Sequence, residues 1–216
     1  MKKYLAIAIV FLTISCNNKV QMDLPKADVT VIKEVFDHSP VYIFFKVEGK
    51  DTIADLNRKN TIGTTNWIFN IDKKLPLKAV IPEIIWLQNK KKNGMHTNDK
   101  AENYYSYADS IGKNLAFVPF TKIEYKLEKP KFGVHIYFSK NNKIIVSDSQ
   151  NSNGKEVKKD ELLKDLLAIP SDKPNKFFFC HDKNSSYQDL VQNTILIGQL
   201  KLQIPTLSIT NEEFVY

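Results

Sequence analysis

Three consecutive residues, Cys180, His181 and Asp182, carry the side chains of a nucleophilic triad: a thiol nucleophile, an imidazole base and a carboxylate that could orient the base. The run Lys176–Cys180 (KFFFC) predicts that they lie at the end of a strand. Successive strand residues point to opposite faces, so Cys180 and His181 do not meet as nucleophile and base. We therefore expect no catalytic residues here and interpret Cys180 as a small buried apolar side chain.

The histidines do not form a metal-binding pattern. A structural or catalytic zinc site needs three or four convergent ligands, whereas the four histidines are scattered and show no paired spacing. We expect no metal and no cofactor. The residues concerned are His38, His96, His135 and His181.

Two Asp-Lys pairs, Asp72-Lys73 and Asp182-Lys183, each follow an apolar run, and Tyr187 comes soon after the second pair. These residues are our candidates for contact with a protein partner; alternatively, the pairs are polar turns between a strand and a helix. The cluster Lys90–Lys92 could touch anionic lipid or polymer, or it could be part of a solvated insertion.

The N-terminus has the pattern of an export signal. A positive start, Met1–Lys3, precedes the apolar run Tyr4–Ile14, which is too short to span a membrane. Cys16 follows directly, and this arrangement resembles the lipobox of bacterial lipoproteins, in which that cysteine is acylated. Thr13 stands where leucine is commonest. The resemblance implies a signal peptide over 1–15, a lipid anchor on Cys16 and a tether over 16–28; the alternative is a signal peptide with a chance cysteine.

Composition narrows the classes of partner. The 216 residues are 43% apolar and 25% charged, with a formal net charge of +7, as in a folded basic protein. Arg58 is the only arginine. Because recognition of bases and phosphates relies on guanidinium groups, we expect no nucleic-acid partner. If Cys16 is acylated, Cys180 is the only thiol left, so no intramolecular disulfide is expected.

The first half alternates strands with a helix. Val41–Val47 and Asp51–Ala54 predict a hairpin, Trp67–Ile71 predicts a strand, and the apolar spacing of Leu77–Gln88 predicts a helix. Pro82 either sits in the first turn of that helix or kinks it.

A lysine-rich loop, Lys90–Lys100, is expected next, followed by a second helix and then by the alternating strand Phe120–Leu127. Asp99 and Glu102 have the spacing of a capping box for that second helix. Its expected apolar face consists of Ala101, Tyr104, Tyr105, Ala108, Ile111 and Leu115.

The second half has the order hairpin, helix, strand, helix, strand. Its fold class is therefore α+β, with helices on one face of a small sheet. Ser186 and Asp189 have capping-box spacing at the start of the last helix. The expected elements are the hairpin Val134–Phe138 and Lys143–Val146, a Leu-rich helix around 162–167 ending before Pro170, the strand Lys176–Cys180, the helix after Ser186, and the strand Gln203–Ile209.

The stretch Val134–Ile209 resembles the periplasmic domain of the ExbD/TolR biopolymer-transport proteins: a hairpin, a Leu-rich helix, a strand ending in Asp182-Lys183, a helix led by Tyr187, and a last strand. The resemblance implies dimerisation and contact with a partner protein or the cell wall. Family members also have a membrane helix with an acidic residue that takes part in proton-driven work. Tyr4–Cys16 has no acidic residue, so that role is not implied.

The first half carries a degenerate copy of the same plan. Phe69 through Lys73 followed by Leu77 aligns with Phe179 through Lys183 followed by Tyr187, at a constant offset of 110, although chance similarity of two short units is the alternative. We expect two tandem ExbD-like modules, over 29–128 and 132–216, the second folding independently. The chain should be a monomer with an internal pseudo-twofold axis, and Phe120–Leu127 and Gln203–Ile209 should lie near the junction.

Three classes of function follow. The leading one is a non-enzymatic periplasmic lipoprotein, anchored through acylated Cys16 in a Gram-negative envelope, that binds or scaffolds a protein of an ExbB/ExbD/TonB-like energy-transduction system. The second is a surface or periplasmic lipoprotein that binds a small ligand or glycan. The third, a hydrolase, has no residue constellation to support it.

Overall fold

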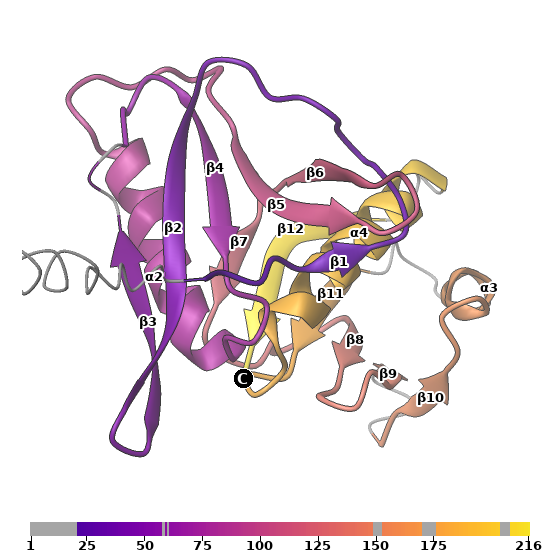
Figure 1. Ribbon diagram of the computed structural model, residues 1–216. Coiled ribbons are helices and arrows are strands. Elements are labelled where there is room, and N and C mark those ends of the chain that lie inside the picture. Colours follow the sequence, from indigo (N-terminus) through magenta and orange to yellow (C-terminus); the bar gives the residue numbers. More distant parts are fainter. Residues whose placement is uncertain (1–20, 58, 60, 149–152, 170–175, 204–207) are drawn as a thin grey trace, which may run out of the picture.

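The computed structural model describes residues 21–57, 59, 61–148, 153–169, 176–203 and 208–216 of the chain. The expected signal peptide, Cys16, and positions 204–207 of the expected last strand lie outside these residues. The described part is a mixed α/β structure with two six-stranded sheets (Figure 1).

The first sheet has the strand order β1-β5-β4-β2-β3, with β6 paired to β5. Helix α2 packs on it through a continuous stripe of buried aliphatic side chains. The elements are β1 (Lys26–Ala27), β2 (His38–Glu48), β3 (Asp51–Asn57), β4 (Asn66–Ile71), α2 (Leu77–Lys92), β5 (Asn103–Asp109) and β6 (Asn114–Pro119).

The second sheet has the order β10-β9-β8-β11-β12-β7. Helix α3 and the C-terminal part of α4 pack on it. The elements are β7 (Glu124–Lys126), β8 (Val134–Phe138), β9 (Ile144–Ser147), β10 (Lys155–Val157), α3 (Leu162–Leu167), β11 (Lys176–His181), α4 (Tyr187–Gln203) and β12 (Ser208–Val215).

Several expected elements are confirmed. The hairpins β2-β3 and β8-β9, the strands β4 and β11, and the helices α2, α3 and α4 form where the pattern predicts. The capping box is present: the Ser186 N–H donates to Asp189 Oδ2 at 3.0 Å, and the Asp189 N–H donates to Ser186 Oγ at 3.2 Å. Pro82 lies beyond the first turn of α2, and the helix continues past it to Lys92.

The expected helix over 101–115 is wrong: this stretch forms the antiparallel pair β5-β6. Its tyrosines also satisfy a strand pattern, because Tyr105 and Tyr107 are buried on one side and are β-favouring residues. The turn between the strands requires Lys113 at φ 56°, and the Asp109 carboxylate accepts the Ile111 and Gly112 N–H groups there. A helix does not allow this geometry.

Three boundaries also differ from expectation. Helix α2 includes Lys90–Lys92, so the loop begins later. Helix α4 continues to Gln203, and the last strand runs from Ser208 to Val215. The described end of the segment assigned to the tether joins the fold, because β1 pairs in parallel with β5 and Ala27 is buried.

The two halves repeat one topology. In each, a hairpin lies beside a central strand in parallel, and a helix connects that strand to a second parallel neighbour. β4 and β11 begin 110 positions apart, as do α2 and α4. Only the second half has a helix, α3, between hairpin and central strand, within the described residues.

The corners between strand and helix contact each other reciprocally. The Leu77 N–H donates to the Ser185 carbonyl at 2.9 Å, and the Tyr187 N–H donates to the Leu75 carbonyl at 2.8 Å. The two bonds are equivalent, because Tyr187 lies 110 positions after Leu77 and Ser185 lies 110 positions after Leu75. The first N–H groups of a helix have no partner within the helix. Here, each helix start is satisfied by the other half.

A second pair of hydrogen bonds follows the same rule. The Lys78 N–H donates to the Lys183 carbonyl at 2.7 Å, and the Gln188 N–H donates to the Lys73 carbonyl at 3.1 Å. The four bonds together relate the two corners as a twofold axis would. We call this contact the junction.

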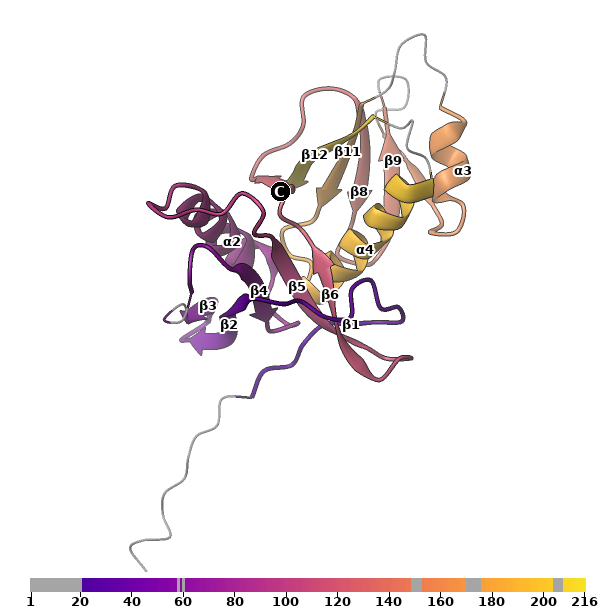
Figure 2. The same cartoon turned by 90° about the horizontal axis from the view of Figure 1, so that it is seen from above.

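The apolar core crosses the expected module boundary. Strand β7 lies within the expected first module, 29–128, but pairs with β12 of the second sheet. The largest buried cluster contains first-half residues such as Phe69 and Leu77, and α4 of the second half lies against β1 and β6 of the first (Figure 2). The second-half members of that cluster are Tyr187, Leu190, Val191, Ile195 and Val215. Residues of both halves therefore share one apolar core.

Candidate functional site

The aspartates of the two Asp-Lys pairs form equivalent turns. Asp72 Oδ1 accepts the Lys74 N–H at 2.9 Å, and Asp182 Oδ1 accepts the Asn184 N–H at 2.8 Å. Such side-chain to backbone bonds fix the chain direction after a strand. This geometry agrees with the turn interpretation of both pairs.

The junction brings the five candidate partner-binding residues together; two of them are buried, and Asp182 is partly exposed. The Lys183 side chain is exposed and that of Lys73 is partly exposed, whereas Asp72 is buried. Tyr187 is fully buried, and its ring packs edge-on against Tyr105 with centroids 5.5 Å apart. The lysine side chains are therefore the parts of these corners best placed to touch a partner.

A buried polar group lies beside the junction. His181 on β11 and Glu213 on β12 are each 1% exposed, and His181 Nε2 lies 3.0 Å from Glu213 Oε2. Nearby, the hydroxyls of Tyr105 and Tyr125 are hydrogen-bonded at 2.9 Å. Burial raises the pKa of both tyrosines well above 10, and the charge of Glu213 contributes to each shift.

Four buried polar atoms in this region have no protein partner: His181 Nδ1, Ser185 Oγ, Tyr187 OH and Glu213 Oε1. A buried polar atom without a hydrogen bond costs about 1 to 3 kcal/mol. Native proteins contain few such atoms, so a local concentration of them requires an explanation.

Cys180 and His181 point to opposite sides of the second sheet, as strand alternation predicts. The Cys180 thiol is fully buried in a cluster with Phe178 and Phe214. The His181 side chain lies away from it and contacts Glu213. Burial raises the pKa of this thiol to about 12. A thiol that stays protonated at neutral pH is a poor nucleophile.

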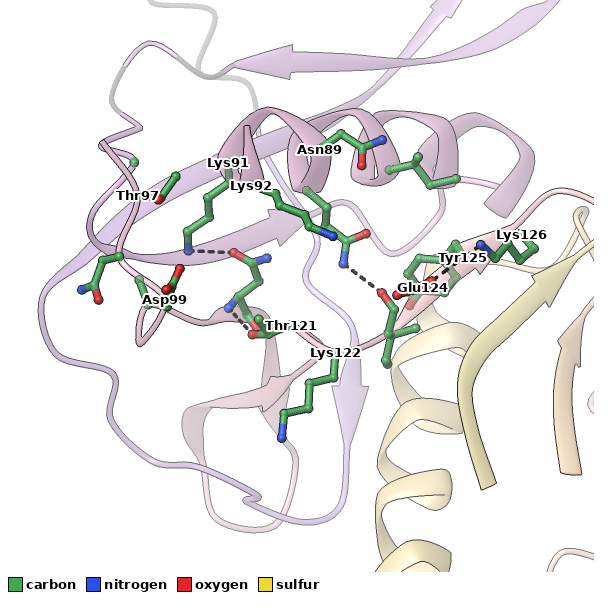
Figure 3. Close-up of a pocket in the computed structure, with 17 residues that line it drawn as sticks. Asn89, Lys91, Lys92, Thr97, Asp99, Thr121, Lys122, Glu124, Tyr125 and Lys126 are labelled. Atoms are coloured by element: carbon green, nitrogen blue, oxygen red, sulfur yellow. Dashed lines mark hydrogen bonds and ion pairs between the residues drawn. The ribbon is translucent and has the colours of Figure 1, made fainter. Parts of the chain in front are cut away.

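A cavity of about 460 Å³ lies between the C-terminal half of α2 and the segment Thr121–Lys126 (Figure 3). It lies within the size range of small-ligand pockets. Its walls carry ammonium, amide, hydroxyl and carboxylate groups, with Ile85 and Ile123 as apolar contacts. The charged lining residues are Lys91, Lys92, Asp99, Lys122, Glu124 and Lys126.

Lys91 differs from its neighbours in the expected solvated lysine cluster. It is 8% exposed, and its Nζ donates to the Glu102 carbonyl at 3.1 Å and to Asn103 Oδ1 at 3.0 Å. The ammonium also lies 5.2 Å from the centre of the Trp67 ring. Burial lowers the pKa of Lys91 to about 8, despite the opposing charge of Glu102.

This lowered pKa predicts a pH-dependent stability. Below pH 8, Lys91 is protonated in both the folded and the unfolded chain. Between pH 8 and about pH 10.4, only the unfolded chain keeps this proton. Over that range Lys91 therefore makes the free energy of unfolding rise with pH. In denaturant titrations from pH 8 to 9.5, the pH slope of the free energy of unfolding should therefore be more positive in the wild type than in Lys91→Met, by at most one proton. The opposing contribution of the buried Cys180 thiol is common to both proteins and cancels in this difference. The range stops there because tyrosine ionisation in the unfolded chain lowers stability near pH 10.

Lys92→Met is the matched control, because Lys92 is the next residue in α2 and is exposed. It should keep the wild-type slope. An equal slope in wild type and Lys91→Met would contradict the assignment.

Sequence reasoning missed Lys91 and Glu213. The helix predicted over Leu77–Gln88 ended before the cluster Lys90–Lys92. The pattern therefore did not indicate which of these lysines faces inward. Glu213 lies in a polar stretch that resembles a loop. A signal for His181 was present, because the aligned residue in the first half is the apolar Ile71.

Among the described residues, no group of three or more histidine, cysteine, aspartate or glutamate side chains is arranged to hold a metal ion. No helix in this part of the chain has the length and apolarity needed to cross a membrane. The chain matches no protein-family model, no curated protein and no solved structure.

Proposed function

We propose that the protein is a non-enzymatic lipoprotein, anchored through acylated Cys16 and facing the periplasm, whose two ExbD-like modules bind or scaffold a protein of an ExbB/ExbD/TonB-like system. The observation that supports this most is the duplicated order of hairpin, strand, helix and strand with a reciprocal junction. The periplasmic domains that the second half resembles pair as symmetric dimers. A junction within one chain would replace that association.

The proposed partner surface is formed by the lysine side chains at the two corners. Lys73 Nζ lies 3.8 Å from Asp23 Oδ2. An ion pair between partly exposed side chains stabilises little, so the Lys73 ammonium can still pair with an acidic partner. Lys183 is exposed on the equivalent corner. Both carbonyls belong to the junction, so side-chain changes leave those backbone bonds in place.

The test has an anchoring arm and a partner arm. Radiolabelled palmitate should be incorporated into the wild type and not into Cys16→Ala, which should remain soluble or uncleaved. The membrane-released wild type should co-purify with ExbB-like or TonB-like components. Lys73→Glu/Lys183→Glu should reduce that recovery at least fivefold with an unchanged thermal transition.

Lys113→Glu/Lys143→Glu is the control, because it reverses the same charge on exposed lysines away from the corners. It should retain the partner. Absence of palmitate would contradict the anchor. Equal recovery with both double variants, or no such component at all, would contradict the partner surface.

The cavity beside α2 supports a second candidate function, binding of a small ligand or glycan. Its mixture of amide, hydroxyl and ammonium groups suits a polyhydroxylated molecule with an acidic group. Native mass spectrometry of the membrane-released protein should then show a bound small molecule, and Lys122→Glu, at the exposed rim, should weaken its retention. Absence of a bound small molecule from both the wild type and Lys122→Glu would argue against this candidate.

A further inference from the structure

Lys91 is a buried cation whose contacts within the chain are uncharged. Its side chain lines the cavity beside α2 and is 8% exposed, and Nζ donates to the Glu102 carbonyl and to Asn103 Oδ1. The Glu102 carboxylate instead accepts the Tyr104 hydroxyl at 2.6 Å. Within the described ranges, no ion pair includes Lys91. Buried charges are usually paired, so this ammonium is available to pair with an anion from outside the chain.

The Asn103 amide beside Lys91 has a free hydrogen-bond donor. Asn103 also lines the cavity and is 4% exposed. Because an ammonium only donates, Oδ1 is the amide atom that contacts Lys91, and Nδ2 remains for another contact. No hydrogen bond joins Nδ2 to another described residue, and Nδ2 is not one of the four enclosed polar atoms without a partner, so it is open to the cavity. The backbone there is fixed, since the Asn103 N–H donates to Thr121 Oγ1 at 2.7 Å and its carbonyl accepts the Phe120 N–H at 3.0 Å.

The ammonium and the amide are two adjacent donors that the fold holds in place. Oδ1 and Nδ2 share one carbon atom, so the free N–H groups of Asn103 lie beside the ammonium. Figure 3 shows the Lys91 side chain extending from α2 toward Thr121, and the Trp67 ring gives the ammonium a further contact. Two adjacent donors match the two oxygens of one carboxylate. Phosphate is commonly bound by guanidinium groups or by several backbone N–H groups, and the described lining of the cavity contains no arginine.

We propose that Lys91 and Asn103 bind the carboxylate of a small organic acid in this cavity. The proposal rests on the second candidate function, ligand binding beside α2, and identifies the acidic group of that ligand. One carboxylate oxygen accepts from Asn103 Nδ2, and the negative charge neutralises the Lys91 ammonium. Ile85 and Ile123 offer apolar contacts to the carbon skeleton, and Lys122 supplies a second positive charge at the exposed rim.

Heteronuclear NMR of the full-length chain during titration with acetate tests the carboxylate contact. The side-chain amide resonances of Asn103 should shift saturably, with a dissociation constant on the order of millimolar for so small a ligand. Acetamide, the uncharged analogue, should leave these resonances unchanged. Lys91→Met should weaken acetate binding by about tenfold, which corresponds to the loss of one charge-assisted hydrogen bond.

Lys90→Met is the matched control, because Lys90 precedes Lys91 in α2, is exposed and does not line the cavity. It should bind acetate as the wild type does. A lysine near the end of a helix can instead serve only to stabilise that helix. In that case acetate leaves the Asn103 resonances of the wild type unchanged, and this result would overturn the proposal whether or not Lys91→Met folds. Tighter binding of inorganic phosphate than of acetate would overturn the choice of carboxylate.

Glucuronate and glucose separate this proposal from the candidate function on which it rests. The two sugars share a hydroxylated ring and differ at one carbon atom, which is a carboxylate in glucuronate and a hydroxymethyl group in glucose. Glucuronate should bind about tenfold more tightly than glucose. Equal binding of the two sugars would overturn the carboxylate site and still support a glycan in the cavity. Glucuronate that binds no more tightly than acetate would contradict the glycan and still support the carboxylate site.

Discussion

A fragment containing only residues 132–216 should fail to unfold cooperatively. It lacks β7 and the first-half side of the shared core, so it exposes apolar side chains that are buried in the whole chain. At about 1.5 to 3 kcal/mol each, five such side chains contribute about 7 to 15 kcal/mol. That is as large as the whole stability of a typical domain. The side chains are Tyr187, Leu190, Val191, Ile195 and Val215.

Near-ultraviolet circular dichroism during heating provides the measurement, with the chain from residue 21 to 216 as the reference. The fragment should show no sharp transition and should bind a dye specific for exposed apolar surface. Mixing it with a 21–131 fragment, which supplies β7, should restore the transition. A sharp transition of the 132–216 fragment near the reference temperature would show that the second half folds independently after all.

Leu77→Asp should unfold both halves together. Leu77 is fully buried at the start of α2, in the cluster shared by the halves. A carboxylate at this fully buried position loses its hydration, and burying a charge in the apolar core destabilises by about 4 to 5 kcal/mol or more. Denaturant unfolding followed by separate probes in each half should show one common loss of structure.

Lys78→Asp is the matched control. It introduces the same side chain one residue later, where the side chain is exposed and the backbone bond to Lys183 is unchanged. A negative charge near a helix N-terminus is slightly stabilising. We therefore expect a change within about 0.5 kcal/mol or a small gain. Equal destabilisation by the two variants, or loss of only the first half in Leu77→Asp, would contradict the shared core.

The strands and helices that were predicted well are those with one unambiguous period. The Leu-rich helix α3, the capping box of α4 and the apolar strand β11 each have a signal that no other structure explains. The prediction of a helix over 101–115 was wrong because the tyrosines there fit both a helical and an alternating pattern. Its true structure is fixed by the turn at Lys113 and by pairing with distant strands, which local sequence does not encode.

The candidate site was predictable only in part. The Asp-Lys corners were found because they repeat, but a repeat does not reveal that the two corners bond to each other. Glu213 meets His181 through the register of two parallel strands, which is fixed by tertiary packing. Lys91 is buried because a helix that extends one turn further brings it over Trp67.

A chain with two equivalent corners can alter one of them alone. In a dimer of identical subunits, every substitution appears twice, once on each side of the symmetry axis. A histidine or glutamate placed beside such an axis would meet its own copy, and two like charges would face each other. Covalent continuity between the halves removes that restriction. Mutation could therefore introduce a charged pair on one side of the junction while the aliphatic residues on the other side continued to hold the halves together.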